Sequence, residues 1–368
     1  MLRYLMIVGI VVLHTPPYVP ISEIGSGVFD FVKAIFQNAA FRATVPVLTL
    51  ISGYLLFRSG LDQHWAQLMK KKARTVLVPF LVFNLIVFVG AFGAQHFFGW
   101  SMTYQLVPFD LSTWINAAFG IERAPINYPL HFLRDLFVLM ALSPLFGFAL
   151  RSRWPWIGLV VVSIISFYNL DGILVMRTTM PIMFYFGGMA ATRQWNLLAL
   201  DRYALPCLGL FLAFCMCLVH FRIANTSYFR FLAPFLIWPA ASLLHDTRVG
   251  HWLQSQSKIS FFIFLAHAPL LLVLSMAYQK LGSGIPYPLY WFAIPILIVA
   301  TLTLLYYALM RLCPRLFASV IGAKPPGDEK LPLSVPARFR HNPRAGSTSL
   351  PASFRSPANR PSESAYTD

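Results

Sequence analysis

Residues 75–96 read TVLVPFLVFNLIVFVGAFGAQH and contain no Asp, Glu, Lys or Arg. A helix that crosses the hydrocarbon core of a bilayer needs about 20 predominantly apolar residues, so this stretch predicts a transmembrane helix. Nine further apolar stretches lie at residues 1–18, 40–57, 130–150, 155–170, 178–193, 203–221, 229–245, 258–278 and 288–312. The sequence therefore predicts an all-α, polytopic integral membrane bundle of about ten transmembrane helices.

The composition of the whole chain agrees with a membrane bundle, since 57% of its 368 residues are hydrophobic and 11% are charged. A soluble domain carries about 25% charged residues. The formal net charge is +16, but the basic residues lie between apolar stretches and near the C-terminus. Because they form no basic domain, nucleic-acid binding is not expected. The four cysteines follow neither a zinc-binding nor a disulfide pattern, and no metal is expected.

The distribution of Lys and Arg between loops predicts the orientation of the chain. With the N-terminus inside, the short cytoplasmic loops carry 12 of these residues and the outer loops carry 7. Positive residues accumulate in cytoplasmic loops, so both termini are expected in the cytoplasm. The first apolar stretch shows no cleavage pattern and is expected to be retained.

Composition also divides the chain near residue 322. Residues 1–321 form the expected transmembrane domain, and residues 322–368 are rich in Pro, Ser and Arg without apolar periodicity. Such a segment cannot bury enough apolar surface to fold, so it is expected to be a disordered basic cytoplasmic tail.

Arg3 and His14 are the most informative pair in the sequence, because both lie in the first apolar stretch with ten residues between them. At about 100° per residue they return to nearly the same helical face, about 16 Å apart along the axis. A coenzyme A thioester, with phosphates at one end and a long pantetheine arm, has the shape to lie between them. The alternative is that Arg3 only follows the positive-inside rule and His14 only caps the helix before Pro16.

Five motifs occur in order along residues 1–312. They are the Arg3–His14 pair, ISGYL at 51–55 after Val45-Pro46, KKKAR at 70–74 before Pro79, PLHFLRDL at 129–136 before Pro144, and IFLAHAP at 263–269. This ordered set resembles the acyltransferase family 3 membrane proteins, which acylate cell-surface polysaccharides. Two positions depart from the family pattern: His131 replaces an aromatic residue, and Phe264 stands where Tyr is common.

The resemblance implies an O-acetyltransferase of the bacterial inner membrane. It would move an acetyl group from cytoplasmic acetyl-CoA to a sugar hydroxyl of a surface polysaccharide or its lipid-linked repeat unit. An exopolysaccharide repeat unit on a lipid carrier is the favoured acceptor, and a xanthan-like polymer, a lipopolysaccharide O-antigen and a periplasmic glucan are the alternatives. A sugar hydroxyl needs a base to accept its proton, so His14 is expected to be the general base or a transient acetyl carrier. Arg3 is expected to be the second catalytic residue, which binds a coenzyme A phosphate or holds the thioester arm. Lys72 and Arg74 are expected to bind the donor as well, although basic residues in that run also serve simply to anchor a loop inside.

Four ionisable residues are candidates for binding the acceptor: Glu122, Arg134, Asp135 and His267. Glu122 lies in a long outer loop, where carboxylates are commonly just solvated. Arg134 and Asp135 are adjacent and project about 100° apart on a helix, so they need not pair. His267 either lines the acyl channel or forms a structural hydrogen bond across the bundle.

Two other functions suit a multi-spanning protein. A glycolipid or polysaccharide transporter or flippase is expected to show polar residues at the bilayer midplane and an internal repeat, and the sequence shows little of either. A non-catalytic membrane partner of polysaccharide assembly proteins would change polymer length and leave acylation intact. Ser52 and Gly53 are expected to allow close helix packing and not to form a nucleophile site.

Overall fold

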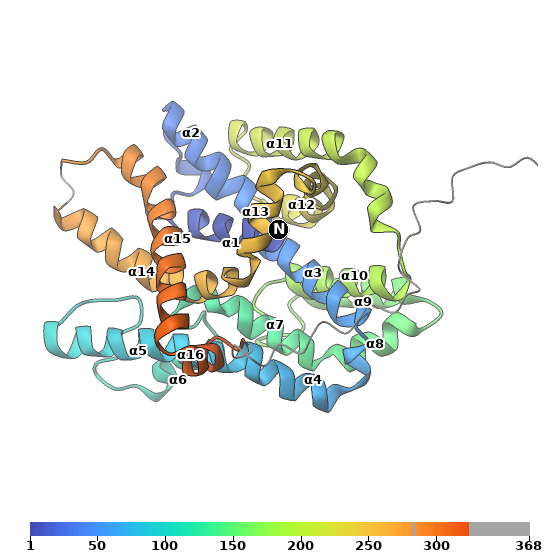
Figure 1. Ribbon diagram of the computed structural model, residues 1–368, viewed down its shortest axis with the longest axis horizontal. Coiled ribbons are helices and arrows are strands. Elements are labelled where there is room, and N and C mark those ends of the chain that lie inside the picture. Colours follow the sequence, from blue (N-terminus) through green and yellow to red (C-terminus); the bar gives the residue numbers. More distant parts are fainter. Residues whose placement is uncertain (282–283, 324–368) are drawn as a thin grey trace, which may run out of the picture. The chain divides into compact units, whose positions relative to one another are not determined.

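The computed structural model describes residues 1–281 and 284–323, which form helices, turns and loops without a β-strand among them (Figure 1). The α-helices are α1 (Leu2–Leu13), α2 (Val28–Ala34), α3 (Thr44–Arg58), α4 (Trp65–Lys72), α5 (Val78–Phe98), α6 (Leu111–Phe119), α7 (His131–Ala141), α8 (Ser143–Arg151), α9 (Pro155–Phe167), α10 (Thr179–Thr192), α11 (Ala204–His220), α12 (Ser227–Ala240), α13 (Arg248–Ser255), α14 (Ser260–Leu281), α15 (Tyr287–Leu312) and α16 (Pro314–Val320). The all-α prediction is confirmed for these residues. The predicted tail, from residue 324 onward, lies outside them.

Six helical segments in the described part of the chain are long and apolar enough to cross a membrane, and a bent pair of helices makes up to seven. The six are Val28–Arg58, Trp65–Phe98, Leu197–His220, Ser227–Leu244, Ser260–Leu281 and Tyr287–Leu312. The predicted stretches 1–18, 155–170 and 178–193 form helices of 12, 13 and 14 residues. These are shorter than the roughly 17 residues of a minimal span. Length and composition therefore support a multi-pass membrane protein, but with fewer full-length spans than ten.

The stretch predicted as one helix over 130–150 is a bent pair in the structure. α7 and α8 meet at a bend of 54°. Pro144 lies in the first turn of α8. Because proline has no N–H to donate, the hydrogen-bond ladder of α7 cannot continue through it, and a new helix begins.

α3 and α10 form the most extensive helix pair of the bundle. Their backbones touch, since a Cβ on Gly53 would overlap the carbonyl oxygen of Phe184 and one on Gly187 would overlap that of Leu50. Small residues allow such close approach between helices in a membrane. Gly53 therefore serves helix packing, as predicted, and the first turns of both helices line a common cavity.

α1 packs against α14, α3 and α15. Its buried residues include Ile7, Ile10 and Val11. This spacing places one helical face toward the other helices, and the next position on the same face is residue 14. The periodicity of α1 therefore carries His14 toward the interior of the bundle.

Asn84 lies in the apolar middle of α5 and is 1% exposed. Its side-chain amide donates to two carbonyl oxygens in the last turn of α6 at 2.8 and 2.6 Å, and its oxygen accepts from the N–H of Asn127 at 2.9 Å. Asn127 also donates to the carbonyl oxygen of Leu265 at 3.3 Å. That carbonyl lacks a helical partner because Pro269 has no N–H. These bonds tie α5 to α14 and fix the loop that leads into α7.

Candidate active site

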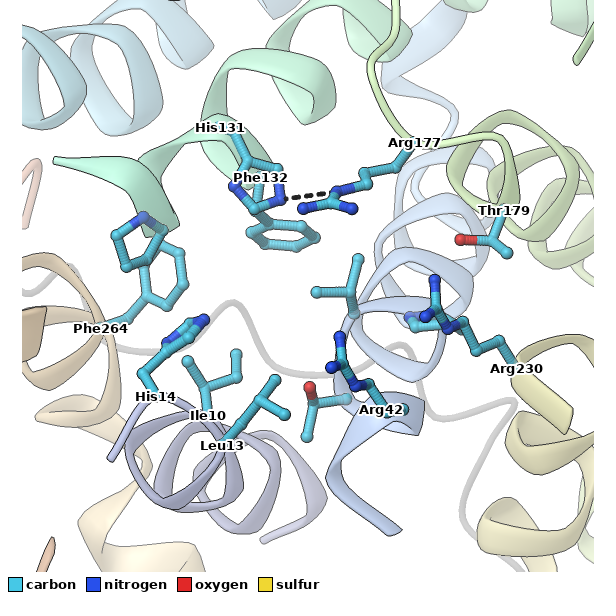
Figure 2. Close-up of a pocket in the computed structure, with 14 residues that line it drawn as sticks. Ile10, Leu13, His14, Arg42, His131, Phe132, Arg177, Thr179, Arg230 and Phe264 are labelled. Atoms are coloured by element: carbon cyan, nitrogen blue, oxygen red, sulfur yellow. Dashed lines mark hydrogen bonds between the residues drawn. The ribbon is translucent and has the colours of Figure 1, made fainter. Parts of the chain in front are cut away.

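A cavity of about 90 Å³ lies where α1 ends (Figure 2). Its apolar wall includes Ile10, Leu13, Phe132 and Phe264. Its polar lining consists of two histidines, three arginines and two threonines: His14, His131, Arg42, Arg177, Arg230, Thr44 and Thr179. The cavity thus combines an apolar wall, imidazole groups and guanidinium groups.

His14 ends α1 with its backbone and lines the cavity with its side chain. Its N–H donates to the carbonyl oxygen of Ile10 at 3.1 Å. Pro16 and Pro17 follow and cannot continue the helical hydrogen bonds. The alternative that His14 only caps the helix therefore describes its backbone, but it does not account for the position of its ring.

His14 and His267 form a hydrogen-bonded pair of imidazoles. Nδ1 of His14 lies 3.2 Å from Nε2 of His267, and Nδ1 of His267 lies 2.8 Å from the carbonyl oxygen of Phe264. A carbonyl only accepts, so Nδ1 of His267 carries the proton and its Nε2 accepts from Nδ1 of His14. In the neutral pair, Nε2 of His14 therefore keeps its lone pair. His267 is fully buried, and it both forms the predicted structural bond and orients His14.

His131 orients Arg177 by the same logic. Nδ1 of His131 lies 2.6 Å from the carbonyl oxygen of Tyr128 and must donate to it, so Nε2 is left to accept. The Nε–H of Arg177 donates to that atom at 3.2 Å (Figure 2). This bond uses one edge of the guanidinium group and leaves its two terminal nitrogens for another partner.

Arg134 and Asp135 form an ion pair at 2.9 Å, which the helical geometry of adjacent residues did not require. Arg134 reaches round the helix because its side chain is long, and it also donates to the carbonyl oxygens of Ile173 and Leu174. Asp135 accepts from the N–H of Met176 at 3.1 Å. The pair thus holds the loop that presents Arg177. Neither residue lines the cavity, and direct contact of either with substrate stays a prediction.

Glu122 lines a second cavity of about 290 Å³, together with Arg123 and Asn169. His131 and Arg177 line both cavities, so the two adjoin at these side chains. Glu122 is exposed, and its predicted role in binding the acceptor is untested.

Arg3, Lys72 and Arg74 lie away from both cavities, and none of the three lines either. Arg3 and Arg74 are exposed, and Lys72 is half-buried and close enough to Arg3 for their charges to repel. The structure thus brings two of the predicted donor-binding residues near each other, at the N-terminal end of α1. It shows no cavity that joins Arg3 to His14 among the two described here.

Comparison with known proteins identifies the family. Residues 1–316 match the acyltransferase 3 family, described as "Acyltransferase domain". The chain belongs to the acyltransferase 3 family. It is also 32% identical over 342 residues to the succinoglycan biosynthesis protein ExoH of Rhizobium meliloti (strain 1021), covering 88% of this chain and 91% of that protein. No solved structure matches the chain significantly.

The resemblance inferred from the motifs is therefore confirmed, and this acyltransferase 3 chain brings three of its motifs together at one cavity. His14 comes from the first motif, His131 from the fourth and Phe264 from the fifth. His267 of the fifth motif bonds to His14 but does not line the cavity. Both positions that depart from the family pattern, His131 and Phe264, line the cavity. Among the described residues, no group of three or more His, Cys, Asp and Glu side chains is placed to hold a metal ion.

The sequence did not assign Arg42, Arg177 and Arg230 to the site. They are three of the seven Lys and Arg residues counted in the outer loops. A signal for them was present, because a cation in an outer loop opposes the positive-inside rule and needs another explanation. Three of the seven outer cations in fact meet at one cavity.

Proposed function

We propose that this acyltransferase moves an acyl group, with acetyl as the predicted group, from a cytoplasmic coenzyme A thioester to a sugar hydroxyl. The acceptor is a surface polysaccharide or its lipid-linked repeat unit. The observation that carries the proposal is the His14–His267 hydrogen bond, because it leaves the Nε2 lone pair of a cavity-lining histidine free. A general base needs that lone pair within reach of the hydroxyl proton.

In the proposed reaction the hydroxyl oxygen attacks the thioester carbonyl carbon while Nε2 of His14 accepts the hydroxyl proton. The tetrahedral intermediate then loses the thiolate of coenzyme A as the carbon–sulfur bond breaks. His14 returns its proton to the thiolate, so the products are an ester and a thiol. The bond from Nδ1 of His14 to His267 holds the ring in both protonation states. In the alternative, His14 carries the acyl group before the sugar receives it.

The donor is proposed to enter from the end of α1 that carries Arg3, with Lys72 and Arg74 attracting its phosphates. Exposed cations near a substrate path raise its local concentration and suit a phosphate ligand. The thioester arm would have to pass about 16 Å along α1 to reach His14. The chemistry proposed here needs no metal.

A glycan acceptor is supported by the relative, which by its name acts in the biosynthesis of succinoglycan. The proposed partners are therefore membrane lipid, the polysaccharide or lipid-linked oligosaccharide, and polysaccharide assembly proteins. No nucleic acid is involved in this proposal. The motifs do not distinguish one acyl group from another. Any test should therefore compare acetyl-CoA with succinyl-CoA as the donor.

The proposed topology has both termini in the cytoplasm, the bundle in the inner membrane, and about ten crossings, three of them by the short helices α1, α9 and α10. Contacts between loops support it. The ion pair of Arg151 with Asp62 joins two loops assigned to the inside, and the bond from Arg222 to the carbonyl oxygen of Ser22 joins two assigned to the outside. Labelling of single introduced cysteines with a membrane-impermeant reagent tests each assignment.

The decisive experiment uses the full-length protein in lipid nanodiscs, radiolabelled acetyl-CoA or succinyl-CoA, and lipid-linked saccharide from a strain that lacks the gene. The wild type is expected to acylate the saccharide, and His14→Ala is expected to abolish this. His220→Ala, an exposed histidine of α11, is the matched control. Labelled protein that accumulates without acceptor would identify the acyl-carrier route. Full activity of His14→Ala would remove the assignment, and saccharide transport without acylation would indicate a transporter.

A further inference from the structure

Three arginines approach the cavity beside His14 from three separate elements (Figure 2). Arg42 lies in the 3₁₀ turn Ala40–Ala43, Arg177 in the loop before α10, and Arg230 in α12. Their charges act on one another in all three pairings. No carboxylate is among the residues that line this cavity.

Each of these guanidinium groups has unused donors among the described residues. Arg177 donates from Nε to His131, and its two terminal nitrogens form no hydrogen bond with the described residues. Arg42 lies 4.8 Å from the ring centre of Tyr18, a cation–π contact. Nε of Arg230 is buried and has no hydrogen-bond partner in the described part of the chain.

The one carboxylate that acts on Arg177 is already engaged. Asp135 also pairs with Arg134 and accepts the N–H of Met176, so its single negative charge is shared and cannot offset all three arginines of the cavity. Like charges gathered in a partly buried site are unfavourable until an anion compensates them. Arginine is the side chain best suited to carboxylate and phosphate, because its fork donates two parallel hydrogen bonds.

We infer that Arg42, Arg177 and Arg230 form a subsite for an anionic group of the acceptor, either the carboxylate of an acidic sugar or the phosphate of a lipid-linked saccharide. The inference rests on the proposed function, since it concerns the acceptor of that reaction. Anchoring the anion there places a neighbouring sugar hydroxyl at Nε2 of His14. The bound anion also offsets the positive charge that His14 takes up with the hydroxyl proton.

The surroundings of the subsite assign the anion to the acceptor and not to the donor. Arg3 and Lys72, the cations proposed for the donor, lie toward the other end of α1, about 16 Å along the axis from His14. Arg177 instead joins the first cavity to the second one, which Glu122 and Asn169 line with polar atoms. A saccharide that extends from His14 past Arg177 therefore finds further polar partners on the side away from the donor.

Binding, measured without catalysis, tests the subsite separately from the proposed function. The full-length protein in nanodiscs of zwitterionic lipid is titrated with an oligosaccharide that carries one uronic acid, with the same oligosaccharide after reduction of its carboxyl group, and with inorganic pyrophosphate. The variants are Arg42→Gln, Arg177→Gln and Arg230→Gln. Arg222→Gln, an exposed outer arginine that does not line the cavity, is the matched control.

We expect each cavity variant to weaken binding of its anion by about tenfold or more and the control to leave it unchanged. If the cavity variants lose binding of the uronic-acid oligosaccharide alone, the subsite binds a carboxylate. If they lose binding of pyrophosphate alone, it binds a phosphate. Unchanged acyl-CoA binding shows that each variant is folded. If the wild type binds both anions no better than the reduced oligosaccharide, the subsite is overturned, whether or not acyl transfer occurs.

A second measurement places the anion on the correct substrate. In acyl-transfer assays the cavity variants are expected to raise the KM for the anionic acceptor by about tenfold and to leave the KM for acyl-CoA unchanged. If they instead change the preference between acetyl-CoA and succinyl-CoA, the arginines bind the acyl group and the inference is wrong. Wild-type protein that binds the anion but transfers no acyl group would contradict the proposed function and retain the subsite.

Discussion

The two ends of α1 carry the two residues of one motif, and their surroundings differ. At the C-terminal end, His14 contacts a fully buried His267 and shares a cavity with three arginines. At the N-terminal end, Arg3 is exposed, with Phe261 under its guanidinium at 5.7 Å. On the proposed function, the motif joins a chemical end, at His14, to an open, electrostatic end, at Arg3. Variants at the two ends should therefore differ in the size of their effect on acyl transfer and in the kinetic constant that they change.

The largest effect is expected for His14→Ala, which removes the lone pair proposed to accept the hydroxyl proton. General bases contribute about 10²–10⁴-fold to rate, so acyl transfer should fall by about a thousandfold with the donor KM little changed. Initial rates with saturating acyl-CoA measure this, and His220→Ala supplies the baseline for loss of an exposed histidine. A fall in rate of less than tenfold would show that His14 is not the general base.

His267→Ala is expected to lower the rate by about 10–100-fold, because the residue bonds to His14 but does not itself line the cavity. His267→Gln keeps an oxygen that can accept from Nδ1 of His14, so it should restore part of the rate. The pH–rate profile is the second readout, since loss of the bond frees His14 to adopt either tautomer. Equal rates and identical profiles for the Ala and Gln variants would mean that His267 only fills space.

Much of this contrast between the ends follows from the sequence. The ten apolar stretches all form helices, and the spacing of Arg3 and His14 on one face agrees with the burial of Ile7 and Ile10 between them. His267 was identified because an ionisable residue within an apolar helix needs a partner in a membrane. These features are local, since each depends on the period of a single helix.

The remainder depends on contacts that no single helix specifies. Arg42, Arg177 and Arg230 converge because α3 packs against both α10 and α12, and because Arg134 fixes the loop before α10. The bend at Pro144 was present in the sequence as a proline, but the angle between α7 and α8 depends on their neighbours. Loop charge counts recorded these arginines without indicating that they meet.

Gly53→Ala tests that helix packing. The added methyl would overlap the Phe184 carbonyl oxygen, so α3 and α10 must separate, which should lower the free energy of unfolding by about 1–3 kcal/mol. Gly90→Ala in α5 is the matched control because its Cβ meets nothing within 4 Å, and it should be neutral or slightly stabilising. Thermal unfolding in detergent compares the two. Equal melting temperatures would contradict the close backbone contact.

The smallest effects are expected at the open end of α1, from Arg3→Gln and Arg74→Gln. Each removes one exposed cation from the proposed donor path, and a single exposed charge contributes about 1 kcal/mol or less. The KM for acyl-CoA should therefore rise severalfold while the maximal rate and the acceptor KM stay nearly constant. The effect should shrink as salt is added, because exposed charges are screened beyond about 8–10 Å. Arg58→Gln, an exposed arginine at the end of α3, is the matched control and should change neither constant. If Arg3→Gln instead lowers the maximal rate as far as His14→Ala does, independently of salt, Arg3 acts in the chemical step and the two ends of α1 form one site.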